Sequence, residues 1–76
     1  MGGRLAGFTY REVTQKLNNF GFSFLRQGKG DHEMWYNQEK NLYTTVVNKG
    51  GKNLKEGTLR AILRQCGIDV NDFLEK

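Results

Sequence analysis

Apolar residues near the start of the chain recur with the period of an α-helix. They fall at i, i+4 and i+7, on one helical face: Val13, Leu17 and Phe20. Thr9 and Glu12 form a capping-box pattern, in which the threonine hydroxyl and the glutamate each accept a bond from the other's backbone N–H. Gly21 suits the position after the helix, because glycine enters the left-handed region freely. The sequence therefore predicts an amphipathic helix over about residues 10–19.

The middle of the chain has the side-chain pattern of β-strands. Three runs rich in aromatic or β-branched residues predict strands over residues 22–27, 31–37 and 42–47. The links between them, residues 28–30 and 38–41, are short. Short links favour an antiparallel meander, because parallel strands need a long crossover.

A second helix is predicted to begin near Lys55 or Gly57. Its apolar stripe falls at i, i+3, i+4 and i+7: Leu59, Ile62, Leu63 and Cys66. We therefore interpret Cys66 as a small apolar core residue. Gly67 is expected to end this helix, and Asp69 can cap a last short turn.

Two amphipathic helices around three strands can cover only one face of the sheet. The predicted fold class is therefore α+β: a two-layer α-β-β-β-α domain with a three-stranded antiparallel sheet. Double-stranded-RNA-binding domains share this order, although a fold does not establish a function. Residues 1–7 are Gly-rich and expected to be a flexible terminus, with residues 8–76 as a single domain.

The pairing of the first two strands is open to two registers. A four-residue turn pairs Arg26 with Glu33 and places Trp35 with the phenylalanines of the first strand. A three-residue turn pairs Arg26 with His32 and gathers a different core: Phe22, Phe24, Met34 and Tyr36. A one-residue slip exchanges the two faces. Both registers keep His32 at the beginning of its strand, beside the turn.

Composition and charge narrow the class of protein. Cys66 is the single cysteine and the N-terminus has no apolar run, so we expect a cytoplasmic protein without a signal peptide or a membrane-spanning segment. The net charge is +4, and residues 1–30 and 48–64 each carry five basic groups and one acidic group. Two basic blocks around the strands indicate an anionic partner, nucleic acid first. The alternative is a solvated lysine-rich surface.

His32, the only histidine, is the first candidate for chemistry. Free imidazole titrates near pH ~6.5, so it exchanges protons near neutrality. A Gly-rich basic turn, Gly28-Lys29-Gly30, precedes it and suits a phosphate backbone. The alternative is an ordinary surface or half-buried histidine at a strand end.

Three stretches occur in the order and spacing of a known family: residues 16–22 (KLNNFGF), 26–32 (RQGKGDH) and 57–68 (GTLRAILRQCGI). The family usually shows a G-S-H turn, and a G-T-L-x-x-I-L helix start followed by a small residue and glycine. On these motifs the chain resembles the HicA (YcfA-like) toxins, small ribonucleases of bacterial toxin–antitoxin systems. The resemblance covers about residues 7–73.

This resemblance implies a dsRBD-like fold, cleavage of mRNA and silencing by a HicB-like antitoxin. It assigns the catalytic role to His32 and the turn position to Gly30. Two departures bear on activity. The family's serine before the histidine is Asp31 here, whose carboxylate would favour the imidazolium if the two groups approach. Many members carry V-P-x-H after the third strand, where residues 46–49 here read VVNK; if that second histidine helps, this chain is less active.

RNA cleavage through its 2′-hydroxyl requires removal of one proton, donation of another and stabilisation of negative charge. His32 is expected to act as the general base, a role that typically gives ~10²–10⁴-fold. Lys29 and the turn amides would stabilise the phosphorane. Because no other residue is an obvious second acid, we predict a slow nuclease with little sequence preference. We expect it to need no metal and no cofactor, since one histidine and one cysteine match no zinc motif and no P-loop is present.

Loop lysines and a helix N-terminus suit phosphates. The predicted RNA-binding residues are Lys29, Gly30, Lys49, Lys52, Lys55 and Arg60, with Arg64 as a further candidate. For the two arginines, the alternative is an ordinary solvated i, i+4 helix face. Base stacking is a second possibility at Trp35, Tyr36 and Tyr43, although core packing is the first expectation for aromatic residues in so small a domain.

Two other function classes fit the same pattern: a non-catalytic RNA-binding module and a protein-interaction domain. RNA degradation by the wild type and by His32→Ala separates a nuclease from a binder. Salt-dependent retention of RNA separates a binder from a protein-interaction domain.

Overall fold

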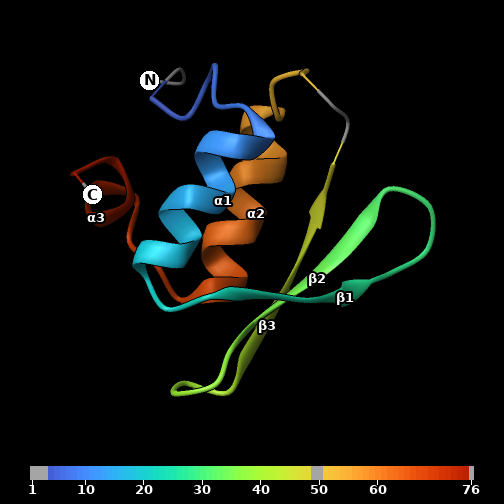
Figure 1. The fold of residues 1–76 in the computed structure, drawn as a ribbon. Helices are drawn as coiled ribbons and strands as arrows, with labels where there is room; N and C mark the ends of the chain where they lie inside the picture. Colours follow the sequence, from blue (N-terminus) through green and yellow to red (C-terminus); the bar gives the residue numbers. More distant parts are fainter. Residues whose placement is uncertain (1–3, 49–50, 76) are drawn as a thin grey trace.

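The computed structural model describes residues 4–48 and 51–75. In this part of the chain it has one helix, three strands and two further helices: α1 (Tyr10–Asn19), β1 (Ser23–Gln27), β2 (His32–Asn37), β3 (Leu42–Val47), α2 (Glu56–Cys66) and α3 (Val70–Glu75). The strands form an antiparallel sheet in the order β1-β2-β3. α1 and α2 lie side by side against one face of this sheet (Figure 1). The predicted α+β class is confirmed.

Both ends of α1 have the predicted chemistry. The Thr9 hydroxyl accepts from the backbone N–H of Glu12 at 3.2 Å, and the Glu12 carboxylate accepts from the N–H of Thr9 at 2.9 Å. Gly21, just beyond the helix, has a φ of 93°, in the left-handed region. The helix is therefore held at both ends while Val13 and Leu17 are fully buried beneath it.

The apolar stripe of α2 is buried as predicted: Leu59, Ile62, Leu63 and Cys66. Gly67 has a φ of 69°, and the N–H of Ile68 donates to the carbonyl of Leu63 at 3.0 Å, which is the long-range bond of a Schellman ending. Burial raises the pKa of the Cys66 thiol to about 11, so the thiol stays protonated and unreactive at neutral pH.

Leu5 belongs to the core, although it lies in the Gly-rich terminus that was expected to be flexible. Its side chain is fully buried in the cluster that also holds Phe22, Trp35 and Phe73. The guanidinium of the preceding Arg4 donates to the side-chain oxygen of Asn71 at 2.7 Å. The residues before α1 therefore pack into the core and bond to the C-terminal segment of the chain. The boundaries of residues 1–7 and 8–76 stay a prediction.

Neither predicted pairing of Arg26 is correct. Arg26 pairs with Met34, while Phe24 pairs with Trp35, and a β-bulge lies between the two pairs. The bulge consumes one extra residue, Leu25, so the register beyond it differs from the register beside the turn. A single turn length could not describe both halves of the strand pair.

The two sides of β2 differ in burial. Glu33, Trp35 and Asn37 face the helices and are buried, whereas His32, Met34 and Tyr36 alternate onto the other side. The register with a four-residue turn, which placed Trp35 with the phenylalanines of the first strand, therefore had the correct core face. Within the described ranges, no helix combines the length and apolar character needed to cross a bilayer.

Candidate functional site

His32 is the first residue of β2 and is exposed to solvent. It lies in a surface hollow of about 450 Å³, which it shares with four neighbours: Lys29, Gly30, Asp31 and Val47. The structure therefore places the predicted catalytic residue beside two of the predicted RNA-binding residues, Lys29 and Gly30. The ring is not packed among the helices.

The ring of His32 is oriented by its own turn. Its Nδ1 lies 2.9 Å from the carbonyl oxygen of Lys29, and the backbone N–H of His32 donates to the same oxygen at 3.1 Å. A carbonyl oxygen only accepts, so the proton of this bond belongs to Nδ1. In the neutral ring, Nε2 then carries the lone pair. This tautomer is the one that a general base needs.

Two glycines give the turn its shape. Gly30 has a φ of 60°, which side chains rarely adopt. At Gly28, an added Cβ would lie 3.2 Å from the backbone oxygen of His32, because the N–H of Gly28 donates to that oxygen at 2.7 Å. Gly28 therefore allows the two strands to approach closely at the site.

Gln27 completes the turn, a role that was not predicted from the sequence. Its side-chain amide donates to the carbonyl of Gly30 at 2.9 Å and to that of His32 at 3.1 Å. One side chain thus holds both ends of the segment that carries the imidazole. A glutamine at a strand end gives no signal of this role in the sequence, because both of its acceptors are backbone atoms.

A second hollow, of about 390 Å³, adjoins the first through Val47. Lys52 and Lys55 line it, at the loop that leads into α2 and at the N-cap of that helix. Because Val47 lines both hollows and pairs with His32 across the sheet, these predicted RNA-binding lysines line the hollow next to that of the imidazole.

The remaining predicted RNA-binding residues that the structure describes are not among those that line the hollow of His32. Arg60 lies one turn into α2, and its guanidinium is 3.7 Å from the carboxylate of Glu56, as an i, i+4 pair. This ion pair matches the alternative of a solvated helix face. Lys49 lies outside the described residues. In the described ranges, no ion pair joins Asp31 to His32, and no cluster of three metal-ligating side chains occurs.

A buried carboxylate lies directly behind the site. Glu33 follows His32 but points to the helix side, where it is 7% exposed. Its Oε1 accepts from the Tyr10 hydroxyl and, at 3.3 Å, from the Trp35 indole N–H, while Oε2 accepts from the side-chain amide of Asn48 at 3.3 Å. Glu33 therefore connects α1, β2 and the end of β3.

This network also supports the segment that carries His32. The backbone N–H of Asn48 donates to the carbonyl of Asp31 at 2.9 Å. Asn48 thus contacts both the residue before the imidazole and, through its side chain, the residue after it. This role of Glu33 was not predicted from the sequence, because a glutamate at an alternating strand position is ordinarily a solvent-facing residue.

The contact between Tyr10 and Glu33 predicts a loss of stability at high pH. Burial, followed by the hydrogen bond and the negative charge of Glu33, raises the pKa of Tyr10 from 10.0 to about 12. Because the folded state holds this proton more tightly than the unfolded chain, its contribution is complete below pH 10 and is lost as pH rises through 12. Denaturant unfolding of wild type and Tyr10→Phe between pH 9 and 12 measures it.

Tyr10→Phe should be less stable than wild type at neutral pH, and its stability should fall less between pH 10 and 12. Cys66, whose pKa is also raised by burial, titrates in both proteins, so the comparison isolates Tyr10. Parallel stability curves for the two proteins across this range would contradict the assignment.

The protein is thus of the class of small two-layer α+β domains that carry an exposed histidine in a basic, glycine-containing turn. A family model described as the HicA toxin of bacterial toxin–antitoxin systems matches residues 10–68. The match extends from Tyr10, the first residue of α1, to Ile68, two residues beyond the end of α2. The chain therefore belongs to the HicA toxin family. No curated protein and no solved structure matches it.

Proposed function

We propose that this chain is a ribonuclease toxin that cleaves mRNA, with His32 as its single catalytic residue. The observation that carries the proposal is the ring geometry: Nδ1 is held by the carbonyl of Lys29, which leaves Nε2 as the basic atom of an exposed imidazole. Membership of the HicA toxin family supports an activity directed against the cell that makes the protein.

In the proposed reaction, Nε2 of His32 takes the proton of a ribose 2′-hydroxyl. The 2′-oxygen bonds to the adjacent phosphorus, and the bond from phosphorus to the 5′-oxygen breaks. The 5′-oxygen leaves with a proton from water, and the other product is a 2′,3′-cyclic phosphate. Lys29, in the same hollow, offsets the charge on the phosphoryl oxygens.

The RNA backbone would approach along the two adjoining hollows. Lys29 lies in the first and Lys52 and Lys55 in the second. Phosphate contacts of this kind position a nucleic acid without reading its sequence. We therefore propose that Lys29, Gly30, Lys52 and Lys55 hold the strand, with Lys49 and Arg60 as further contacts and little sequence preference.

The proposal includes a protein partner. A toxin of a toxin–antitoxin pair has to be silenced, and the net charge of +4 favours an acidic inhibitor. We propose a HicB-like antitoxin that covers the hollow around His32, with both proteins in the cytoplasm, where mRNA is found.

The chemistry of the products tests the mechanism. Attack by the 2′-hydroxyl predicts fragments that end in a 2′,3′-cyclic phosphate and a 5′-hydroxyl, identified by mass spectrometry. The same oligonucleotide made with deoxyribose throughout should resist cleavage completely, because the nucleophile is missing. EDTA should leave the rate unchanged. Cleavage of the deoxy oligonucleotide, or products that carry a 5′-phosphate, would contradict the mechanism.

A further inference from the structure

We infer that the sheet face opposite the helices binds single-stranded RNA by stacking a base on Tyr43, a subsite separate from the basic hollows around His32. The inference rests on the proposed function, because it names the form of RNA that the same catalytic residue would meet.

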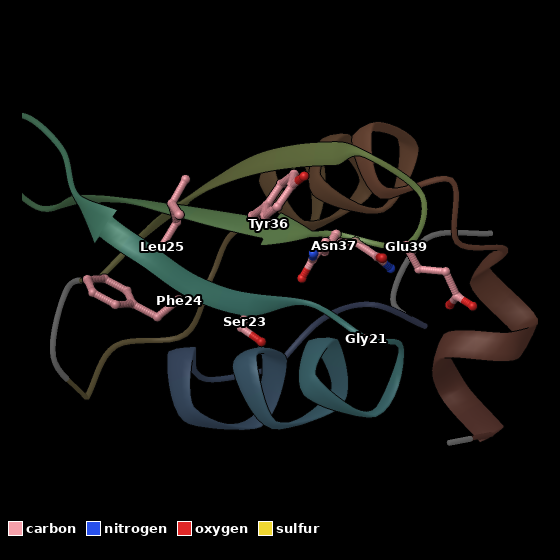
Figure 2. Close-up of a pocket in the computed structure, with 8 residues that line it drawn as sticks. Gly21, Ser23, Phe24, Leu25, Tyr36, Asn37 and Glu39 are labelled. Carbon is pink, nitrogen blue, oxygen red and sulfur yellow. The ribbon is translucent and has the colours of Figure 1, made fainter.

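The face is defined by side chains from all three strands, here called the open face: Leu25, Arg26, Met34, Tyr36, Tyr43 and Thr45. Strand pairing places Met34 opposite Thr45 and Tyr36 opposite Tyr43, and the Thr45 hydroxyl reaches the sulfur of Met34 at 3.5 Å. The bulge adds two residues of β1 opposite Met34, Leu25 and Arg26. Figure 2 shows Leu25 and Tyr36 on the same side of the β1–β2 pair.

The aromatic pair is the feature that fits a base. The rings of Tyr36 and Tyr43 are stacked, with centroids 4.5 Å apart and planes inclined by 29°. Tyr36 is partly covered and bonded through its hydroxyl to the side chain of Asn41, whereas Tyr43 is 49% exposed. The inner ring therefore supports the outer one, which offers solvent a ring of fixed orientation. Preordered aromatic rings are what proteins that bind single strands use to stack bases.

The aromatic residues that the sequence offered for core packing or base stacking thus have different environments in the fold. Trp35 is 5% exposed and lies in the core, as expected. Tyr43 is not a core residue, because the helices cover the other side of the sheet and no element of the described chain covers this one. Strand pairing alone does not require two aromatic residues at this position, since a pair of threonines or of opposite charges would also stabilise the hairpin.

The open face continues into the catalytic site. His32, Met34 and Tyr36 alternate along the same side of β2, so the imidazole and the aromatic pair are about 13 Å apart along the strand. Stacked nucleotides rise about 3.4 Å each, so about four nucleotides or fewer separate the two positions. Arg26 is exposed between them and brings a positive charge to the backbone of such a strand.

A hollow beside the pair gives a displaced base or sugar room. It has a volume of about 680 Å³ and is lined by β1, the end of β2 and the turn that follows β2, with Leu25, Tyr36 and Asn37 among its lining residues (Figure 2). A duplex could not present a base to Tyr43, because its bases are stacked and paired inside the helix. The substrate class indicated by this face is therefore unpaired RNA.

The experiment measures binding in the His32→Ala protein, so that RNA stays intact. The probes are a short oligoadenylate and an abasic ribose-phosphate oligomer of equal length and charge. The preference for the oligoadenylate should fall about 5- to 20-fold in Tyr43→Ala, which is the lower part of the range for base–aromatic stacking. Tyr43→Val retains strand propensity and should lose the same preference, whereas Tyr43→Phe should keep it.

Phe24→Ala is the matched control. Phe24 is 51% exposed, but its ring packs edge-on against Trp35 on the other side of β1, with centroids 6.1 Å apart. Phe24 also lines the hollow shown in Figure 2, but it does not contact Tyr43, so its removal should leave the base preference unchanged. A loss of the preference in Phe24→Ala, with none in Tyr43→Ala, would place the base in that hollow and overturn the inference.

An unchanged preference in Tyr43→Ala and Tyr43→Val would overturn the inference, and so would an equal loss of affinity for both probes. A change in self-association without a change in RNA binding would assign the face to a protein contact and also overturn it. If base preference depends on Tyr43 but the chain with His32 intact cleaves no RNA, the catalytic proposal fails and the stacking site stands.

Discussion

RNA cleavage should fall by about 10²–10⁴-fold when His32 is replaced by alanine, while the domain stays folded. The activity is lost because the imidazole is the proposed base, and no second histidine exists in the chain to replace it. The fold survives because the ring is exposed and its side-chain bond to the Lys29 carbonyl contributes about 1 kcal/mol. Cleavage of a labelled RNA and thermal unfolding of both proteins measure the two effects.

His32→Asn is the sharper variant. The amide of asparagine can still donate to the carbonyl of Lys29, at the place of Nδ1, but it offers no base at the position of Nε2. It should therefore match the stability of wild type and the inactivity of His32→Ala. In the cell, both variants should abolish growth arrest. Full toxicity of either protein would show that His32 is not the catalytic residue.

Glu33→Ala should destabilise the domain by about 2–4 kcal/mol, because it removes the acceptor of three side-chain donors at once. Two of these donors would be left without the carboxylate, the indole N–H of the buried Trp35 and the hydroxyl of the partly buried Tyr10. A domain of this size has only about 3–5 kcal/mol of stability, so the variant should be partly unfolded at 37 °C, the assumed growth temperature. Urea unfolding followed by circular dichroism measures the loss.

Tyr10→Phe serves as the control for Glu33→Ala. It removes one donor and leaves the carboxylate bonded to Trp35 and Asn48, so we expect a loss of only about 1 kcal/mol. If Glu33→Ala costs no more than Tyr10→Phe, the carboxylate is not the centre of the network. Such a result would leave the turn bonds of Gln27 as the main support of the His32 segment.

The fold was predictable from local features that each act over a few residues. The capping box at Thr9 and Glu12 and the left-handed glycine at Gly67 determine helix ends by bonds to nearby backbone groups. The stripe that ends at Cys66 is read from the helical period alone. The position of His32 beside a Gly-rich turn was equally visible, because the turn and the strand are adjacent in sequence.

The face and the contacts of each strand residue were not predictable in the same way. A bulge at Leu25 changes the register within one strand pair, and nothing in the local sequence marks an extra residue of this kind. The roles of Gln27 and Glu33 depend on backbone and side-chain partners that the fold brings near, such as Tyr10 from α1. The burial of Leu5 likewise depends on a core assembled from distant segments.

The sequence by itself determined the order of helices and strands, the basic character of the chain and the residue most suited to proton transfer, because periodicity, capping and side-chain chemistry are local properties. Only the tertiary structure decided that the His32 ring is held by Lys29, that Glu33 is buried behind it and that Tyr43 faces solvent. The physical reason is that strand register and the packing of the helices on the sheet depend on contacts made across the whole domain. A shift of one residue in the register exchanges the buried and the exposed face of a strand.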